Sequence, residues 1–338
     1  MKKLKIGIVG CGRISEVHKE SFMNLGYMVV VVFAVDKDIS KAKQFSESFK
    51  GCRYSDKIED IVHEQLDVVH ILTPHYLHKT HVELCLRAGF HVLTEKPIAT
   101  KLEDAIQMKK TADETGKQLG VIFQNRYIDG IREAKKMLEQ GVLGKVTGVW
   151  STLHWHRPPS YYEIDWKGSW QKEGGGVVID QAIHSIDLVR YLMGKEISTI
   201  KGQIDTRVLT MIEVEDVASA AITFDDGTVY SFFACNYFTV NSPIRIEWST
   251  EKGSILLEGD IVKIKIGENE RIISPAVNQG GEGESYWSNF HYYQIKDFYE
   301  CILENRPVPI EPTDAIKTLE AVLGIYQSSN ENKEIRLR

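Results

Sequence analysis

The sequence has no long hydrophobic run, no large excess of charge of one sign and few cysteines. Its longest apolar stretch, 27–35, has nine residues, whereas a membrane-spanning helix needs roughly 18. We therefore expect a soluble protein in which this stretch is a buried strand. The 338 residues include 41 Lys and Arg against 47 Asp and Glu, a net charge of −6 spread along the chain. This distribution lacks the basic stripe of a nucleic-acid-binding protein, so nucleic acid is not an expected partner.

The five cysteines are odd in number, widely spaced and without a C-x-x-C pair. This pattern argues against a disulfide framework or a cysteine zinc site, and it indicates reduced thiols in a cytoplasmic protein. The opening MKKLKIGIVGCGRIS is basic at its start, but glycines and Arg13 interrupt its apolar part. We interpret it as a first strand and not as a signal peptide.

The length predicts two domains, and residues 1–124 have the pattern of the first. Short apolar runs alternate there with amphipathic stretches, which predicts an α/β fold with a doubly wound, mostly parallel sheet. The expected strands are 5–9, 29–35, 68–72, 91–94 and 119–123, and the expected helices are 14–25, 39–49, 58–63, 77–88 and 102–115.

Residues 125–338 have longer strand-like stretches of alternating polarity, which predict a second α/β domain with an open, mostly antiparallel sheet. A turn at 225–228 suits a hairpin, and 275–288 is expected to be a loop. The expected strands are 146–156, 197–208, 217–224, 228–238, 244–249, 254–257 and 261–266, and the expected helices are 131–140, 179–193, 290–304 and 313–328.

A glycine-rich turn follows the first strand and opens the next helix, with the residues Gly10-Cys11-Gly12-Arg13-Ile14-Ser15. Gly10 allows a tight turn, Gly12 lets the backbone approach a pyrophosphate, and the helix N-terminus supplies amide donors. Ser15 replaces the third glycine of the usual fingerprint. We interpret the turn as the phosphate cradle of a dinucleotide; a turn that uses glycine for its backbone angles alone is the alternative.

Asp36 ends the second strand, 21 residues beyond Ser15. An acidic side chain at this position accepts hydrogen bonds from the adenosine ribose and repels a 2′-phosphate, which favours NAD over NADP. Lys37 follows and is compatible with a 2′-phosphate, so NADP stays open. The structural alternative is that Asp36 caps the helix expected near Ile39.

Polar residues also stand at the ends of the fourth and fifth strands, in Thr73-Pro74-His75 and Glu95-Lys96-Pro97. The carboxyl edge of a doubly wound sheet forms its ligand crevice, so both tripeptides are placed to contact a ligand. Lys96 can present its ammonium to a substrate hydroxyl there. A salt bridge to a surface carboxylate fits the position equally well.

The second domain contributes a glycine run at 174–176, followed by Asp180, His184 and Asp187. Asp180 and His184 are four residues apart at the head of a helix and share one face. A histidine can take the hydroxyl proton that hydride transfer releases, and a neighbouring carboxylate can orient the imidazole. Alternatively, Asp180 is a helix N-terminal charge and His184 a core histidine.

Other residues are candidates for substrate contact. His154 and His156 lie on one side of a strand, and with Arg157 they form either a substrate rim or an oligomer interface. Asn125 and Arg126 follow the last strand of the first domain, where Arg126 can reach a hydroxyl, phosphate or carboxylate.

Three histidines, His75, His78 and His81, recur every third residue. They spread over about 120° of a helical face and have no carboxylate among them, so we expect no metal site.

Taken together and in this order, the glycine turn, Glu95-Lys96-Pro97 and the segment 174–187 resemble the glucose-fructose oxidoreductase/inositol dehydrogenase (Gfo/Idh/MocA) family. The match spans nearly the whole chain. Its most specific part is Glu-Lys-Pro followed about eighty residues later by G-G-G-x-x-x-D-x-x-x-H-x-x-D. Membership implies an N-terminal Rossmann domain, a C-terminal α/β domain with an open antiparallel sheet, and reversible NAD(P)-linked oxidation of a sugar or cyclitol hydroxyl.

The resemblance also implies roles for individual residues. Lys96, Asp180 and His184 fall on the family's catalytic constellation, in which the histidine relays the proton, the lysine holds the reacting oxygen and the aspartate orients its neighbours. Trp166-Lys167 corresponds to a Trp-Arg near the cofactor, with a point charge in place of a planar guanidinium. After Thr-Pro, His75 stands where the family commonly has Asn, while His78 is retained.

We therefore expect an NAD(P)-dependent oxidoreductase that acts on a sugar, sugar derivative, nucleotide-sugar or inositol and forms a homodimer or homotetramer through its open sheet. One alternative is a cofactor-retaining isomerase or redox hydrolase, which tightly held cofactor after gel filtration would favour. Another is a non-catalytic NAD(P)-sensing protein, although a sensor has no need of a proton relay formed by Lys96, Asp180 and His184.

Overall fold

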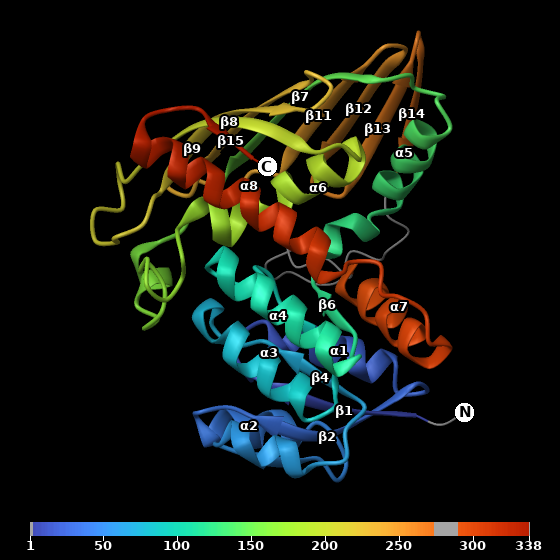
Figure 1. The fold of residues 1–338 in the computed structure, drawn as a ribbon, viewed down its shortest axis with the longest axis vertical. Coiled ribbons are helices and arrows are strands. Elements are labelled where there is room, and N and C mark those ends of the chain that lie inside the picture. Colours follow the sequence, from blue (N-terminus) through green and yellow to red (C-terminus); the bar gives the residue numbers. More distant parts are fainter. Residues whose placement is uncertain (1–2, 274–289, 338) are drawn as a thin grey trace. The chain divides into compact units, whose positions relative to one another are not determined.

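The computed structural model describes residues 3–273 and 290–337, which form two compact units, each with its own sheet (Figure 1). The first unit comprises the described residues up to Gln124 together with 290–316. The second comprises those from Asn125 to 273 together with 317–337. The sequence predicts a single boundary after residue 124, whereas the chain returns to the first unit after the second sheet.

The first unit holds a six-stranded parallel sheet in the order β3-β2-β1-β4-β5-β6, the doubly wound order of dinucleotide-binding folds. The predicted parallel sheet is therefore confirmed. Its strands are β1 (Leu4–Val9), β2 (Val29–Val35), β3 (Arg53–Ser55), β4 (Val68–Ile71), β5 (His91–Thr94) and β6 (Leu119–Val121). Its first helices are α1 (Ser15–Asn24), α2 (Ile39–Ser46), α3 (His78–Arg87) and α4 (Leu102–Thr115), with 3₁₀ segments at Ile58–His63 and His75–Leu77.

Helix α7 (Phe290–Glu304) explains why the chain returns to the first unit. Its buried face, which includes Ile295, Phe298 and Tyr299, belongs to the same apolar core as β1 and β2. Gly120 in β6 leaves room for this helix, because a Cβ there would lie 2.8 Å from the Phe298 ring. An amphipathic pattern predicts a helix but does not say which sheet the helix covers.

The second unit contains a nine-stranded sheet in the order β14-β13-β12-β11-β7-β10-β9-β8-β15. Strands β7 and β10 pair in parallel and the other neighbours pair antiparallel, which confirms the predicted mostly antiparallel sheet. The expected loop at 275–288 lies outside the described residues. The strands are β7 (Val146–His154), β8 (Ile197–Asp205), β9 (Val217–Phe224), β10 (Val229–Cys235), β11 (Arg245–Thr250), β12 (Gly253–Glu258), β13 (Ile261–Ile266), β14 (Asn269–Ile273) and β15 (Ile335–Arg336).

Helices α6 (Ile183–Met193) and α8 (Pro312–Glu331) lie against one face of this sheet, and α5 (Asp129–Glu139) lies beside β13 (Figure 1). Gly202 in β8 allows the close approach of α8, because a Cβ there would lie 3.0 Å from Ile325. A π-helical turn, Val178–Ala182, leads into α6. None of the helices in the described ranges has the length and apolar character needed to cross a bilayer.

Candidate active site

The glycine turn after β1 has the geometry of a phosphate cradle. Gly10 has a φ of +97°, and a Cβ there would lie 2.7 Å from the backbone of Leu72, so the position requires glycine. A Cβ at Gly12 would meet no atom within 4 Å, which leaves open space beside the backbone at the start of α1. Ser15 is buried, and its hydroxyl donates to the Gly12 carbonyl at 2.6 Å. A small residue thus closes the turn where the fingerprint has its third glycine.

Asp36, half-buried at the end of β2, holds the same turn from the other side. Its Oδ2 accepts the backbone N–H of Cys11 at 2.7 Å, and its Oδ1 accepts that of Asp38 at 2.9 Å. The cap of α2 is Asp38, whose side chain accepts from the N–H of Ser40. Helix capping therefore does not explain Asp36. In dinucleotide-binding folds, an acidic residue at the end of the second strand recognises the ribose.

We expect Asp36→Ala to lower the preference for NAD over NADP at least about tenfold in the ratio of kcat/KM values, because it removes both a ribose hydrogen bond and the repulsion of a 2′-phosphate. The alanine also leaves two turn N–H groups without this acceptor, which weakens both cofactors together. Asp36→Asn is the matched variant, since it keeps an acceptor oxygen but loses the charge. An unchanged preference in both variants would restrict Asp36 to supporting the turn.

The ends of β4 and β5 are tied together by His78, at the start of α3. Its ring nitrogens lie 2.8 Å from the Thr73 carbonyl and 2.7 Å from the Pro97 carbonyl, and the side chain is fully buried. His81 contacts the Thr73 hydroxyl at 3.1 Å, and His75 packs its ring against that of His78. Each of the three histidines thus has its own partner near the ends of β4 and β5.

Lys96, between the buried residues Glu95 and Pro97, is half-buried, and Pro74 is also half-buried at the end of β4. On the cradle side, Arg13 and Lys37 are exposed and Ile14 packs against the core. The first unit therefore gathers the glycine turn, Asp36 and Lys96 at the carboxyl ends of its parallel strands.

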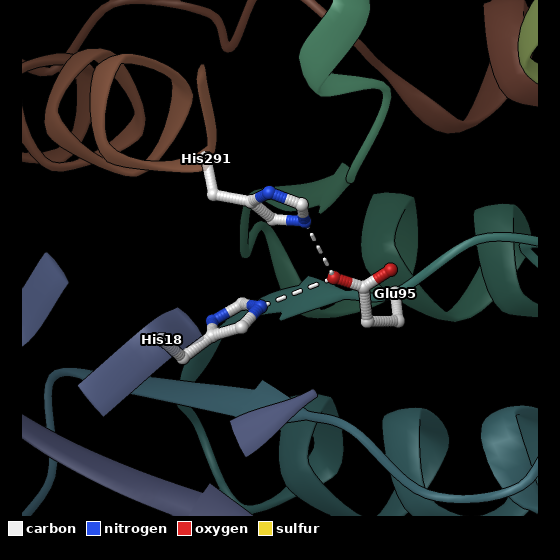
Figure 2. A group of neighbouring side chains, drawn as sticks. All are labelled: His18, Glu95 and His291. Atoms are coloured by element: carbon white, nitrogen blue, oxygen red, sulfur yellow. Dashed lines mark hydrogen bonds and ion pairs between the residues drawn. The ribbon is translucent and has the colours of Figure 1, made fainter. Parts of the chain in front are cut away.

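A buried polar network surrounds Glu95, and sequence reasoning missed it. His18 from α1 and His291 from α7 both face one carboxylate oxygen of Glu95 (Figure 2). His18 also contacts His70 in β4, which in turn contacts Tyr299 in α7. These residues come from four elements, so neither spacing nor periodicity along the chain connects them.

In the second unit, the glycine run lets the chain pass against a buried carboxylate before the π turn. A Cβ at Gly176 would lie 1.9 Å from the Glu215 carbonyl oxygen, so this position requires glycine. The Glu215 carboxylate accepts the N–H groups of Gly176 at 2.7 Å and Val178 at 3.0 Å, and the Tyr326 hydroxyl donates to it at 2.9 Å. Glu215 therefore anchors the turn that carries Asp180.

Asp180 is buried at a convergence of donors. Tyr161 and Lys167 each donate to its Oδ2 at 2.6 Å, and Gln181 donates to the same oxygen at 2.5 Å. Lys167 also donates to Glu173 at 2.8 Å, so its ammonium joins two buried carboxylates. This arrangement fixes the position of the Asp180 carboxylate and compensates its charge.

These contacts shift the pKa values of the groups around Asp180. Burial opposes the charge on Lys167, but Asp180 and the other neighbours hold the Lys167 pKa well above its ordinary value. Burial raises the pKa of Glu173 to about 7, against the opposite effect of Lys167. Burial also raises the pKa of the Tyr161 hydroxyl, and Asp180 adds to the rise. Within this unit, Lys167 pairs with both Asp180 and Glu173, and its contact with a cofactor stays a prediction.

His184 is half-buried in the first turn of α6, four residues beyond Asp180. The expected helix 179–193 begins as a π turn, a form common at functional sites. Arg126, expected to contact substrate, donates to both oxygens of Asp187 at 2.7 and 2.5 Å, and both side chains are buried. This pair holds α6 to the segment after Asn125, and the contact of Arg126 with substrate stays a prediction.

The segment 154–157 contacts the stretch that follows β10. His154 packs against Phe233 and Phe238, and the exposed His156 has its Nδ1 2.8 Å from the Phe238 carbonyl. Arg157 donates to Asn241 at 3.1 Å and its guanidinium lies over the Tyr161 ring. Trp166 in turn lies under the Lys167 ammonium, 4.1 Å from its ring centroid. Tyr161 thus connects this segment to the donors around Asp180.

We expect the free energy of unfolding of the second unit to fall between about pH 5 and pH 8, because burial raises the pKa of Glu215 to about 7. A carboxyl group whose pKa is higher in the folded than in the unfolded state contributes its full stabilisation below about pH 5 and loses it as the pH rises through the folded pKa. For Glu215 this loss of free energy of unfolding is roughly 3 kcal/mol. Urea unfolding followed by tryptophan fluorescence reports this, since five of the six tryptophans lie in residues 150–248.

The variant Glu215→Gln should reduce the decrease in the free energy of unfolding with pH. The decrease that remains is expected from Glu173, whose pKa is also raised to about 7. Glu334→Gln is the matched control, because Glu334 is exposed. A decrease that is unchanged in Glu215→Gln would contradict the prediction.

Comparisons with known proteins match both units. The model of an oxidoreductase family with an NAD-binding Rossmann fold matches residues 4–123, and the model of the GFO/IDH/MocA C-terminal domain matches residues 131–256. The residues of the cradle and of the Asp180 cluster fall within these two ranges.

Two curated relatives illustrate the range of similarity. The 1-carboxy-3-chloro-3,4-dihydroxycyclohexa-1,5-diene dehydrogenase of Comamonas testosteroni is 33% identical over 257 residues, which are 74% of this chain and 62% of that protein. The aligned region thus spans less than two thirds of that relative. The scyllo-inositol 2-dehydrogenase (NAD(+)) of Bacillus subtilis (strain 168) is 23% identical over 345 residues, 99% of this chain and 96% of that protein.

Solved structures are similar over the full chain. The WlbA dehydrogenase from Chromobacterium violaceum, crystallised with NADH and UDP-GlcNAcA, is 26% identical with a TM-score of 0.89, over 100% of this chain and 97% of that one. Levoglucosan dehydrogenase in complex with NADH and levoglucosan is 21% identical with a TM-score of 0.89, over 99% of each chain, which shows the fold. Because the two family models together match most of the chain, the protein belongs to the Gfo/Idh/MocA oxidoreductase family, whose N-terminal part is an NAD-binding Rossmann fold.

Proposed function

We propose that the protein transfers a hydride between NAD and the carbon that bears a ring hydroxyl of a polyhydroxylated small molecule. The observation that carries the proposal is the Asp180 cluster, in which a buried carboxylate, fixed by Tyr161, Lys167 and Gln181, stands one helical turn before His184. A histidine one turn beyond a fixed carboxylate can take a hydroxyl proton. The cradle of Gly10, Gly12 and Asp36 supports NAD as the hydride acceptor.

Each residue of the constellation has a distinct role in the proposal. His184 takes the proton of the substrate hydroxyl, while Lys96 holds the oxygen and stabilises its alkoxide character. Asp180 is the positioning residue that orients His184, and Lys167 pairs with the Asp180 carboxylate. The nicotinamide, when bound, accepts the hydride. Asn125, His154, His156 and Arg157 are proposed to contact the remainder of the substrate.

The substrate class rests on the named activities of the relatives. They include dehydrogenases of a dihydroxycyclohexadiene carboxylate, of scyllo-inositol and, in Escherichia coli (strain K12), of D-glucosides, the last 24% identical over 99% of this chain. These substrates share vicinal hydroxyl groups on a six-membered ring. We therefore propose a cyclitol, a sugar or a sugar derivative as the substrate.

The test is a panel of inositols, hexoses, glycosides, nucleotide-sugars and cyclic diol carboxylates, each supplied with NAD and followed by absorbance of the reduced nicotinamide. Turnover of at least one ring polyol, lost in His184→Ala, supports the proposal. Binding of NAD without turnover of any member would favour the non-catalytic sensor.

We also propose that the second unit mediates homo-oligomer formation. Along β9 and β10 the side chains alternate between buried and more exposed, and Val229 is 48% exposed. A sheet face of this kind is commonly covered by a second copy. Sedimentation at micromolar concentration should give a dimer or a tetramer, and a monomer there would contradict the assignment.

A further inference from the structure

Three buried side chains converge at the end of β5. The Nε2 atoms of His18 and His291 lie 3.1 and 3.4 Å from the same Oε1 of Glu95 (Figure 2). The other carboxylate oxygen accepts the backbone N–H of Lys96 at 3.2 Å. The three side chains are 0%, 3% and 9% exposed, so solvent contributes little to the stabilisation of their charges.

The contacts form a chain of hydrogen bonds with a defined direction. When Glu95 is ionised, its carboxylate accepts but does not donate, so the Nε2 atoms of His18 and His291 carry protons in that state. A neutral imidazole has one donor and one acceptor, which makes the Nδ1 of His18 the acceptor for the Nδ1–H of His70, 2.9 Å away. The Nε2 of His70 then accepts the Tyr299 hydroxyl at 2.8 Å. This pattern pairs every donor in the chain while all three imidazoles stay neutral.

A protonated ring would break the pattern. An imidazolium at His291 would turn its buried Nδ1 into a donor, and this atom has no hydrogen-bond partner among the described residues. An imidazolium at His18 would reverse the chain, so that His70 donates to Tyr299 and the buried hydroxyl loses the acceptor it has in this structure. An unmade hydrogen bond of a buried donor is costly.

The environments of His18, His70 and Glu95 favour the same protonation states for these three groups. Burial lowers the pKa of His18 and lowers that of His70 well below its ordinary value. Burial opposes the charge on Glu95, but the contacts from His18 and His291 prevail and hold its pKa well below the ordinary range. The cluster therefore carries a net negative charge.

We propose that Glu95 is a permanent buried anion with a neutral histidine shell, and that this charge strengthens the binding of oxidised nicotinamide relative to reduced nicotinamide. The inference rests on the proposed NAD-dependent function. Asp36 marks the adenosine half of the crevice on β2, so the nicotinamide half faces β4 to β6, where Glu95 directly follows β5. The oxidised ring is positively charged and the reduced ring is neutral, so a fixed anion interacts differently with the two forms.

The test is equilibrium binding of NAD⁺ and NADH to the wild-type protein and to Glu95→Gln. We expect the ratio of the NAD⁺ to the NADH dissociation constant to rise at least about threefold in the variant. A general loosening of the fold would weaken the binding of NAD⁺ and NADH equally, so it would leave the ratio of their dissociation constants unchanged. Tyr299→Phe is the matched control, because it shortens the same chain but retains the charge. Lys96→Met, which removes a cation next to Glu95, should shift the ratio in the opposite direction.

A second measurement addresses the charge without cofactor. Long-range ¹H–¹⁵N NMR of the imidazole rings should show His18 and His291 as neutral Nε2–H tautomers and His70 as the neutral Nδ1–H tautomer. An imidazolium at His18 or His291 near neutral pH, or an unchanged binding ratio in Glu95→Gln, would overturn the inference. If neither nucleotide binds to the wild type, the proposed NAD-dependent function fails instead, and the NMR spectra still decide the charge of the cluster.

Discussion

His184→Ala should lower kcat by about 10²–10⁴-fold and leave cofactor affinity nearly unchanged. The variant removes the proposed proton acceptor, whereas the glycine turn and Asp36 belong to the other unit and keep their contacts. The measurement is steady-state kinetics with a substrate identified from the panel, beside titration of NAD. His63→Ala is the matched control, since His63 is exposed, lies in the 3₁₀ segment Ile58–His63 and is not a candidate site residue.

Lys96→Ala should lower kcat by at least the same factor, because it removes the charge that stabilises the developing alkoxide. In the double variant the losses should be far from additive, since groups that serve one proton transfer act as a unit. If His184→Ala turned over a confirmed substrate at the wild-type rate, the histidine would be structural and Lys96 would be left as the candidate base.

The parts of the fold that depend on local pattern were predictable from the sequence. Continuous apolar runs identified the parallel strands, and an amphipathic pattern identified helices such as α4. The cradle was also readable, because a strand, a glycine turn and a distant acidic residue form one local unit. The very short strands β3 and β15, with three and two residues, were missed because such lengths carry no periodicity.

The parts that depend on contacts between distant segments were not predictable. The pairing of Arg126 with Asp187 joins residues 61 apart, and that of Tyr299 with His70 joins residues 229 apart. In the sequence, Arg126 appears as a cation at a domain junction and His70 as a polar residue within an apolar strand. The ion pair of Glu173 could have been suspected from the sequence. Glu173 directly precedes the glycine run, where the backbone packs closely, and an acidic residue buried there needs a cationic partner.

Lys167→Met should lower the free energy of unfolding of the second unit by about 3–5 kcal/mol at pH 8, because it leaves two buried carboxylates without their ammonium. The side chains of Lys167, Glu173 and Asp180 are 6%, 1% and 8% exposed, so water cannot replace the lost charge. Methionine keeps the apolar part of the side chain, and the loss therefore comes from the ammonium and its hydrogen bonds. Urea unfolding by tryptophan fluorescence measures it.

The same loss should be smaller at pH 5. The pKa of Glu173 is raised to about 7, and Lys167 is the group that holds it down, so the variant raises it further. Protonation of Glu173 at pH 5 then removes one of the two uncompensated charges, and adding Glu173→Gln should recover part of the stability at pH 8. Lys167→Arg, which keeps the charge and can donate to two carboxylates, should stay close to the wild type. A methionine variant within about 1 kcal/mol of the wild type at pH 8 would mean that Asp180 does not depend on Lys167 for its charge.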